Sequence, residues 1–524
     1  MSTPLARPNY SRRVYLLLGI VLGFRLLYAA IVPENPAGDE AYYWDWGRHL
    51  DYGYYSKPPF IAWLYAFVDW IGNGSLFGIR ATAAILGAFS ALILYRLTSA
   101  MFDERVGWTA LIICLAAPAS SVLSFFLTID APLTLCWSIA LWMLWRYISG
   151  AGKTGTLVVL FFALGIGHLS KQMMMAFPVL AVALLLLHRD TRPLLKRPGL
   201  LLVLFGSYVS LIPPLVWNAQ NEWITFTHTQ HHFQTGASEG NLIQETLKHF
   251  FEFIGSQLGV LSPIFGVVLY WVSLSGLKNI RAASLPVRFL LVFGALPLAG
   301  MLILALRQEL QPNWPAVFYT SSLILTGAFF SSAMSGDRKE SKFSPQAWRK
   351  IFVFAATTGF LLSAYFYVSP IVYQAIGKPG HKADPNRRLM AHDDMAAGFE
   401  KFRSGQPDSD ELFIVTIGHR DFASHLAFAL PDQPEVYLWE AFDQTISQYQ
   451  LWNNPYEDGF SAQDGLILLP GGGTPPTTFS DGFSKVEKLG EYDVSYGYDR
   501  SLTFTVFRGF GLKFWPKGSP LPES

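Results

Sequence analysis

A succession of long apolar segments limits this chain to one class of fold. A membrane-spanning helix needs about 20 mostly apolar residues, and eleven segments approach or reach that length. They are Val14–Val32, Ile79–Ala100, Val106–Phe126, Ala131–Ile148, Thr156–Ser170, Met173–His188, Gly199–Trp217, Phe251–Ser275, Pro286–Leu306, Pro315–Met334 and Ile351–Ser369. The chain is 51% hydrophobic and only 15% charged, which excludes an ordinary soluble globule. We therefore predict an α-helical polytopic membrane protein with 11 to 13 transmembrane helices.

The basic residues between these segments predict how the chain crosses the membrane. Cytoplasmic loops carry an excess of Lys and Arg, and Arg7, Arg12 and Arg13 precede the first apolar segment. Basic residues recur in every second loop, at residues 105, 153, 189–197, 278–288 and 338–350. We therefore predict a cytoplasmic N-terminus and an extracytoplasmic C-terminus.

The last part of the chain has an ordinary, mixed composition and no further span. Short apolar runs predict strands, and amphipathic runs between them predict helices. The strands are Glu411–Ile417, Glu435–Trp439, Gly465–Leu469 and an edge strand at Ser501–Arg508, and the helices are Leu389–Arg403 and Phe422–Leu430. We predict a membrane domain over residues 1–371 and a small extracytoplasmic α/β domain over residues 372–524.

Unusual polar groups gather on the predicted outer side of the membrane. The first outer loop, residues 38–60, reads GDEAYYWDWGRHLDYGYYSKPPF and leads into Phe60–Ile71, an apolar segment too short to span that we predict to lie along the membrane surface. Asp130, Lys171 and the segments Asn218–His232 and Arg307–Trp314 fall on the same side. Polar groups at helix ends that face a bundle interior tend to mark function.

These residue types suit transfer of a group from a phosphate-linked donor. Asp39, Glu40 or Asp130 can act as a general base, and Lys171 can hold a phosphate. Structural alternatives stay open for each of them. Asp39 and Glu40 can be solvated loop acids, Asp130 can cap a helix, and Lys171 can extend to the lipid headgroups. Arg307 can bind phosphate or pair with Glu309.

The segment after Asn218 contains three histidines. Histidines three or four residues apart can share a helix face and bind a divalent metal, which makes His231 and His232 metal candidates beside His228. Neither an HExxH nor an HxE pattern occurs, so a loop without metal is the alternative. A divalent metal ion is therefore left open as the cofactor.

Several motifs together resemble a known family. GDEAYYW…GYYSKPPFIAW, LTIDAPL, LSKQ, PPLVWNAQNEW and LQPNWPA are similar, in this order, to motifs of bacterial GT-C-type membrane glycosyltransferases. The resemblance is strongest to the branch related to the lipid A aminoarabinose transferase and the protein O-mannosyltransferases, and covers about residues 10–330. The later stretch HRDFASHLAFALPDQPEVY is similar to tails found in that branch.

The resemblance implies an inverting enzyme that uses a polyprenyl-phosphate-linked sugar. Asp39 matches the catalytic acid of the family, Glu40 adjoins it, and Asp130 matches a second acid. Lys57, with Lys171 and Arg307, is implied to bind the donor phosphate. The candidates for sugar or acceptor binding are Tyr42, Tyr43, Asn218, Glu309, Asn313 and Trp314. Relatives often have an acid where this chain has Ser56, so the family's metal site is not carried over.

The expected function is therefore sugar transfer to an acceptor on the periplasmic face of the bacterial inner membrane. The expected acceptor is lipid A, lipopolysaccharide or another envelope glycan, and membrane lipids, not nucleic acid, are the expected surroundings. A protein acceptor is the alternative within the same chemistry. A transporter of lipid-linked sugars predicts polar groups near mid-membrane instead, and a sensor protein would depend on the α/β domain alone.

Overall fold

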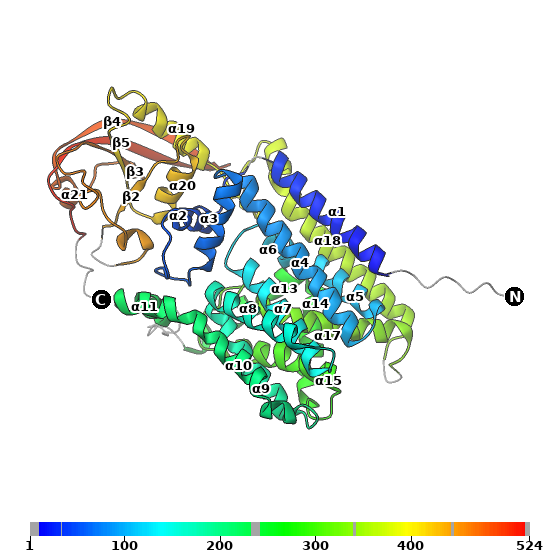
Figure 1. Cartoon of the computed structure of the whole chain (residues 1–524). Helices are drawn as coiled ribbons and strands as arrows, with labels where there is room; N and C mark the ends of the chain where they lie inside the picture. The colour runs from blue at the N-terminus through cyan, green and yellow to red at the C-terminus, as the bar shows by residue number, and fades with distance from the viewer. Residues whose placement is uncertain (1–9, 33, 232–241, 339–341, 442–444, 519–524) are drawn as a thin grey trace.

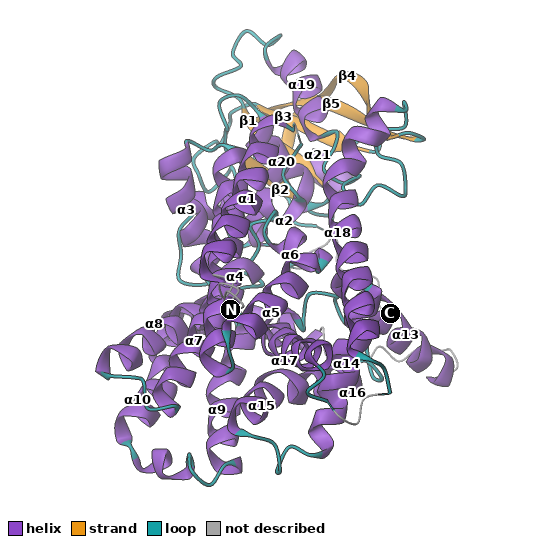
Figure 2. Ribbon diagram, turned by 90° about the vertical axis from the view of Figure 1, so that its right-hand side faces the viewer, coloured by secondary structure: helices purple, strands orange, loops and turns teal. Residues whose placement is uncertain are grey.

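A bundle of helices carries a mixed α/β domain at one end (Figures 1 and 2). The computed structural model describes residues 10–32, 34–231, 242–338, 342–441 and 445–518. The helices of the bundle are α1 (Tyr10–Ile31), α2 (Gly38–Arg48), α3 (Phe60–Gly72), α4 (Leu76–Met101), α5 (Glu104–Ala116), α6 (Pro118–Leu123), α7 (Asp130–Ile148), α8 (Thr154–Ser170), α9 (Ala176–Leu187), α10 (Pro198–Gly206), α11 (Ile212–Gln220), α12 (Ile224–His231), α13 (Leu242–Leu261), α14 (Pro263–Lys278), α15 (Leu285–Leu290), α16 (Leu296–Leu304), α17 (Ala316–Ser335) and α18 (Pro345–Ala375).

Six helical stretches in the described residues are long and apolar enough to cross a membrane. They are Tyr10–Ile31, Leu76–Met101, Pro198–Gln220, Leu285–Leu304, Ala316–Ser335 and Pro345–Ala375, and the pair Gln244–Leu261 and Pro263–Lys278, bent by 113°, makes a seventh if it is one span. The polytopic helical class is confirmed, but the predicted number of 11 to 13 exceeds what this criterion finds. The difference comes from apolar runs that are interrupted or short.

Breaks in the backbone explain that difference. The predicted span Val106–Phe126 is divided into α5 and α6, because Ala117 is extended and Pro118 begins a new helix. The bend between α13 and α14 lies at Ser262, whose φ of 70° is left-handed, followed by a proline. The helical stretches Thr154–Ser170 and Gln172–Leu187 are shorter than a full span.

The bundle packs through aromatic clusters and small residues. The Trp137 ring meets Phe177, Phe293 and Phe318 edge-on, with ring centroids 5.1, 6.3 and 5.5 Å away. Where α17 crosses α5, Gly327 lies so close to Ala110 that an added Cβ would be 2.7 Å from its side chain. Small residues permit such close helix approach in membranes.

The α/β domain is built on a five-stranded sheet of order β2-β1-β3-β5-β4. Its strands are β1 (Phe413–Ile417), β2 (Val436–Trp439), β3 (Gly465–Pro470), β4 (Phe483–Gly497) and β5 (Arg500–Leu512), and its helices are α19 (His392–Arg403), α20 (Arg420–Ala429) and α21 (Thr477–Ser480). The strands β1, β2 and β3 are parallel, and β5 runs antiparallel to both β3 and β4. The first three predicted strands are confirmed.

The predicted edge strand is wrong in position. Ser501–Arg508 belongs to β5, which lies inside the sheet between β3 and β4. The outer strand β4 is rich in charged residues, and most of its side chains are exposed or half-buried, so no apolar run marks it in the sequence. The domain boundary at residue 371 stays a prediction, and α18 continues as one helix to Ala375.

The α/β domain shares a core with the helices α2 and α3, which lie where the two parts meet (Figure 1). The Trp44 ring of α2 packs edge-on against Phe428 of α20 at 5.0 Å. Tyr449 donates a 2.5 Å hydrogen bond to the buried carboxylate of Asp45. His425 of α20 lies 3.1 Å from the Pro36 carbonyl oxygen. The helix α2 and the segment before it are therefore held by contacts with the α/β domain.

We predict that Gly327→Ala destabilises the helical bundle. The new methyl group would lie 2.7 Å from the Ala110 side chain and 2.8 Å from its Cα, so the helices must separate. Overpacking of this kind costs about 1–3 kcal/mol. The measurement is the thermal unfolding midpoint in detergent. Gly300→Ala on α16 is the control, because its Cβ would meet nothing within 4 Å, and equal midpoints for both variants would contradict the prediction.

Candidate active site at the junction of bundle and sheet

The helix α2 carries the two adjacent acids of the sequence motif into different surroundings. It begins after Ala37, and Glu40 reaches back to accept a 2.9 Å hydrogen bond from the Ala37 backbone N–H. Acids in the first turn of a helix are favoured by its dipole. Consecutive helix positions differ by about 100°, so Asp39 is half-exposed while Glu40 is fully buried.

Glu40 is one half of a buried ion pair. Its Oε2 lies 3.0 Å from Arg80 Nη2, and its Oε1 accepts a 3.0 Å hydrogen bond from the Leu127 backbone N–H. The Arg80 guanidinium also lies 3.9 Å from the Phe125 ring centre. Burial raises the pKa of Glu40, and Arg80 opposes that shift. These contacts tie α2 to α4 and to the segment before α7, which favours a structural role for Glu40 over the predicted catalytic one.

Asp130, Lys171 and Asn313 converge from distant parts of the chain. Asp130 is 2% exposed in the first turn of α7. Its Oδ1 accepts a 2.8 Å bond from Lys171 Nζ, and its Oδ2 accepts a 2.6 Å bond from Asn313 Nδ2. Ile129, not Asp130, occupies the N-cap, and Asp130 makes no capping bond. The alternatives of a helix cap and of a lysine that extends to headgroups are therefore not what the structure shows.

Lys57 is a cation without a counter-ion among the described residues. It lies part-buried in the loop between α2 and α3, and its ammonium makes no hydrogen bond or ion pair there. Burial, together with the nearby Lys171, lowers the pKa of Lys57, while Asp39 and Asp130 are close enough to oppose this. A partly desolvated charge without a partner is unfavourable. The position is therefore suited to an anionic group of a ligand.

Arg420 is a site residue that the sequence did not single out. It comes from the start of α20 in the α/β domain, and its Nη2 lies 3.2 Å from Asp39 Oδ1. The guanidinium stacks over the buried Tyr42 ring, 4.1 Å from its centre. The one signal was its place in HRDFASHLAFALPDQPEVY, the stretch that resembles tails of the family. The α/β domain thus supplies a side chain to the site.

The remaining predicted residues differ in their surroundings. Tyr42 is fully buried, and its hydroxyl accepts a 2.5 Å bond from the Gln448 backbone N–H, while Tyr43 beside it is 3% exposed. Asn218 is buried, donates to the Pro214 carbonyl oxygen and accepts from the Thr225 N–H. These bonds use its amide within the fold.

The predicted residues of the loop after α16 also differ in their exposure and in their contacts. Arg307 and Glu309 are exposed, and the described residues include no ion pair between them. Trp314 packs beside the cluster of Phe253, Ala305 and Leu310. Of this loop, therefore, only Asn313 has a contact with Asp130 in the described structure.

The histidine segment offers little for a metal. His228 Nδ1 lies 3.1 Å from the Tyr55 hydroxyl. The helix α12 ends at His231, but the His231 side chain and all of His232 lie outside the described residues. Within the described ranges, no group of three or more His, Cys, Asp and Glu side chains is arranged to hold a metal ion. Ser56, which replaces the family's acid, is buried at 9% exposure.

A cavity of about 880 Å³ lies between the bundle and the α/β domain. Asp39, Asp130, Asn313 and Arg420 all line it. Lys57 and Lys171 do not, although Lys171 contacts Asp130 directly. The cavity therefore reaches the acids directly, and Lys171 only through its contact with Asp130.

We predict that substitution of the two neighbouring acids destabilises the protein to very different extents. Glu40→Gln leaves the Arg80 charge buried without a counter-ion, which costs about 3–5 kcal/mol. Asp39→Asn changes a half-exposed pair with Arg420, for which about 0–1 kcal/mol is expected. The measurement is the thermal unfolding midpoint of both variants in detergent. A midpoint for Glu40→Gln as high as for Asp39→Asn would show that the buried pair does not anchor α2.

Comparison with known sequences agrees with the resemblance seen in the motifs. Residues 56–217 match the family model described as dolichyl-phosphate-mannose-protein mannosyltransferase. The chain is also similar to the lipid A galacturonosyltransferase RgtD of Rhizobium johnstonii, with 28% identity over 316 residues. That match covers 58% of this chain and 63% of the relative, so it spans less than two thirds of the relative's length.

Comparison with solved structures shows the same fold over nearly the whole chain. ArnT from Cupriavidus metallidurans in the apo state superposes with a TM-score of 0.62 at 14% identity, covering 94% of this chain and 98% of that one. The same protein bound to undecaprenyl phosphate gives 0.61 at 15% identity, covering 95% and 98%. The family match over residues 56–217 and the shared fold therefore both agree with the resemblance of the motifs to GT-C-type membrane glycosyltransferases.

Proposed function

We propose that the chain is an inverting glycosyltransferase that takes its sugar from a polyprenyl phosphate. The observation that carries the proposal is Lys57, a part-buried ammonium without a partner among the described residues, beside the Asp130–Lys171 pair. A phosphate monoester or diester supplies the missing negative charge. The related fold has been solved with undecaprenyl phosphate bound, which supports a lipid phosphate as the ligand of this site.

The two lysines have different roles in this proposal. The Lys171 ammonium is already paired with Asp130 Oδ1 at 2.8 Å. Lys171 therefore fixes the geometry of the site more than it attracts an anionic ligand. Lys57 has no ion pair or hydrogen bond within the described residues, although Asp39 and Asp130 are near it. Its ammonium holds the donor phosphate and stabilises the negative charge that grows on the leaving oxygen. The Asp130–Lys171 pair in turn holds in place the side chains that border the donor.

Asp39 is the proposed general base. Its Oδ1 is paired with Arg420, and its carboxylate faces the cavity at half exposure. Asp130 has both oxygens occupied and is buried, which leaves it less free to accept a proton. Asp39 takes the proton of an acceptor hydroxyl as the hydroxyl oxygen forms a bond to the anomeric carbon. The bond from that carbon to the phosphate oxygen breaks, and its electron pair leaves with the polyprenyl phosphate.

The proposed acceptor is a lipid of the bacterial envelope, with lipid A as the first candidate. Support comes from the relative described as a lipid A galacturonosyltransferase. A protein acceptor is the second candidate, supported by the family model named for protein mannosylation. Both use the same donor chemistry, so they are separated only by offering each acceptor to the enzyme.

The proposed location is the bacterial inner membrane, with the N-terminus in the cytoplasm and the α/β domain in the periplasm. The alternating basic loops support this orientation. The α/β domain lies at one end of the bundle (Figure 2), and residues of both parts line the cavity that contains Asp39, Asp130 and Arg420. A transporter would instead need its polar groups near the middle of the bilayer.

We predict that Asp39→Asn lowers the turnover number by about 10²–10⁴-fold, the usual contribution of a general base. The Michaelis constant for the donor should stay nearly unchanged, because the phosphate contact is elsewhere. The measurement uses purified protein in nanodiscs, a set of undecaprenyl-phosphate-linked sugars, and mass spectrometry of the transferred or hydrolysed sugar. Asp493→Asn on β4 is the matched control outside the site, and near-normal turnover by Asp39→Asn would exclude this base.

We predict that donor binding weakens at alkaline pH because Lys57 loses its proton. Burial lowers the pKa of Lys57 below the ordinary lysine value, so the ammonium and its hold on phosphate are present below that lowered pKa and are lost as the pH rises through it. Lys57→Arg stays charged throughout this range and should bind at higher pH than the parent. The measurement is the dissociation constant for undecaprenyl phosphate against pH, and identical pH profiles for both proteins would contradict the role of Lys57.

A further inference from the structure

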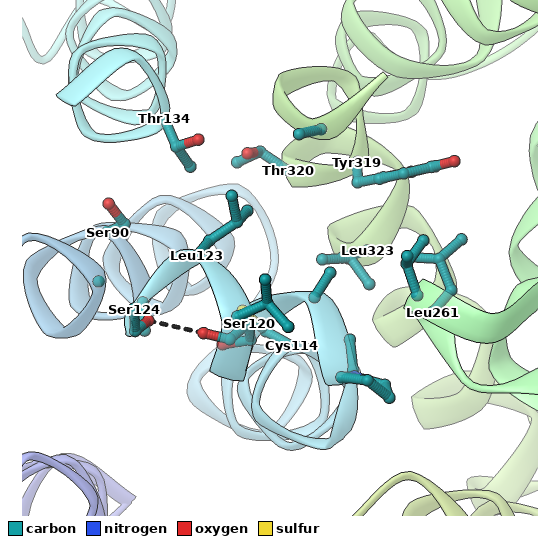
Figure 3. A pocket seen from close by; sticks show the side chains of 18 of the residues that line it. Ser90, Cys114, Ser120, Leu123, Ser124, Thr134, Leu261, Tyr319, Thr320 and Leu323 are labelled. Carbon is teal, nitrogen blue, oxygen red and sulfur yellow. Dashed lines mark hydrogen bonds between the residues drawn. The ribbon is translucent and has the colours of Figure 1, made fainter. Parts of the chain in front are cut away.

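A polar cavity of about 470 Å³ lies beside β2, the strand at one edge of the sheet. Its described lining comes from β2, from residues 449–454 and from the end of the described chain. It shares no described residue with the cavity that contains Asp39. It also differs from the apolar cavity inside the bundle, where Leu123 and Leu323 border the space (Figure 3). The polar cavity is therefore a separate place for a ligand, and we call it the edge cavity.

Aromatic rings form one part of the wall of the edge cavity. The Trp452 ring is half-buried and packs against His49, whose ring centre is 4.3 Å away, and against Tyr449, which meets it edge-on at 5.2 Å. The Trp439 indole is buried and donates a 2.8 Å hydrogen bond to the Pro516 carbonyl oxygen. These contacts hold the rings in place before a ligand binds. A rigid indole that is partly open to a cavity offers a large apolar surface at little cost in conformational entropy.

Glu440 is a carboxylate of this lining with unused capacity for hydrogen bonds. It follows β2 directly, is half-buried, and has no hydrogen bond or ion pair within the described residues. Burial raises the pKa of Glu440 to about 7, and His419 nearby opposes that shift. An ionised carboxylate accepts hydrogen bonds at both oxygens. A ligand with several hydroxyl donors therefore suits this position.

The other charges of the lining disfavour an anionic ligand. Glu435 and Glu457 also line the cavity, the first 3.2 Å from His49 and the second accepting a 3.0 Å bond from the Asn454 backbone N–H. Lys517 is the one cation of the described lining. Three acids against one cation repel phosphates and carboxylates. The described residues also hold no group of three His, Cys, Asp and Glu side chains arranged for a metal ion.

The open edge of β2 adds backbone groups to the same cavity. Among the described strands β2 pairs with β1 alone, so the N–H and C=O groups of its outer edge have no strand partner. Sugar hydroxyls both donate and accept hydrogen bonds, and can use both kinds of group. An extended peptide can also pair with an open edge. Here, however, β2 has only four residues and Pro516 lies against Trp439, which favours a compact ligand.

The wall of the edge cavity is connected to α2. Tyr449 lines the cavity, and its hydroxyl donates a 2.5 Å hydrogen bond to the Asp45 carboxylate of α2. The backbone N–H of the adjacent Gln448 donates to the Tyr42 hydroxyl at 2.5 Å, and its side-chain oxygen accepts from the Tyr55 backbone N–H at 2.7 Å. A ligand that orders this wall therefore also stabilises α2 and the loop after it.

We propose that the edge cavity binds a short oligosaccharide without acidic groups, with the C–H face of one sugar ring against Trp452 and hydroxyl groups donating to Glu440. The inference goes beyond the proposed transfer reaction, because it concerns a second site and does not depend on the chemistry at Asp39. Its ligand class combines an apolar ring face with many hydroxyls and no negative charge, which are the properties that this lining selects.

Direct binding of oligosaccharides tests the inference without any transfer reaction. The purified full chain is placed in phosphatidylcholine nanodiscs, because detergents with sugar headgroups compete for such a site. Isothermal titration calorimetry then compares maltotetraose, the tetramer of glucosamine, tetragalacturonate, and an octapeptide of alternating Lys and Thr. We expect maltotetraose or the glucosamine tetramer to bind at least about tenfold more tightly than tetragalacturonate, the factor that 1.4 kcal/mol represents. Failure of both at millimolar concentration, or binding of the peptide in their place, would overturn the proposal.

Matched variants locate the ligand within the cavity. Trp452→Ala should weaken binding about tenfold, while Trp70→Ala, which removes a 79% exposed indole of α3 outside this lining, should not. Glu440→Gln should weaken binding about threefold, because the amide still accepts a hydrogen bond but has lost the charge. Its control is Glu487→Gln on the outer strand β4. If the unfolding midpoint shows that Trp452→Ala does not fold, Trp452→Phe replaces it with a smaller loss. Unchanged affinity in the variants of both Trp452 and Glu440 would contradict the inference.

Hydrogen exchange distinguishes the edge cavity from the proposed transferase site. A bound oligosaccharide should slow amide exchange in β2 and in residues 449–454, and leave the start of α20, where Arg420 lines the larger cavity, unchanged. Protection at Arg420 without protection in β2 would mean that the sugar binds at the transferase site, and the inference would be wrong. Absence of sugar transfer from every donor would remove the proposed function and leave this binding result unaffected.

Discussion

The buried pair of Glu40 and Arg80 is the contact on which the geometry of the site depends. A charge of either sign is costly inside a protein unless it is paired and hydrogen-bonded, and here one carboxylate is held by a guanidinium and by two backbone N–H groups. Those donors belong to α4, to the start of α2 and to the segment before α7. By fixing Glu40, the pair fixes the rotation of α2, and with it the direction in which Asp39 faces.

The α/β domain completes the site and is not an independent appendage. Its helix α20 packs on α2 in one hydrophobic core, and its Arg420 pairs with Asp39 while stacking on Tyr42. The same domain contributes Lys382, Arg387, Arg388 and Arg500 to the lining of the cavity of about 880 Å³. Removing the domain would therefore take away a partner of the proposed base as well as part of the cavity lining. A sensor function located in this domain alone does not account for these contacts.

The sequence predicted the class of fold and most of the residues at the junction, because both leave local signals. Long apolar runs mark membrane helices, and charged residues at their ends stand out, so Asp39, Asp130 and Lys171 were recognised before their contacts were known. The roles of Glu40 and Arg420 left no such signal. Arg80, the partner of Glu40, is one of two arginines in the apolar helix α4, and Arg420 is separated from Asp39 by 381 positions.

The differences between prediction and structure in the number of spans and in the strand order also have physical causes. The predicted number of spans exceeds the six or seven long apolar helices of the described residues, because breaks such as those at Pro118 and Ser262 depend on backbone conformation, which hydropathy does not report. The position of β5 was missed because β4, its outer neighbour, has few buried side chains. Strand order is decided by pairing across the chain, and an exposed outer strand contributes little to an apolar pattern.

Most charged groups of the site are already paired with a group of opposite charge, and this distinguishes the residue that binds the donor from the residue that acts as base. Asp130 neutralises Lys171, and Asp39 is paired with Arg420, so two cations are compensated before any substrate arrives. Lys57 has no ion pair within the described residues, which leaves it for the proposed donor phosphate. Asp39, as the proposed base, is the group whose loss affects turnover more than donor binding.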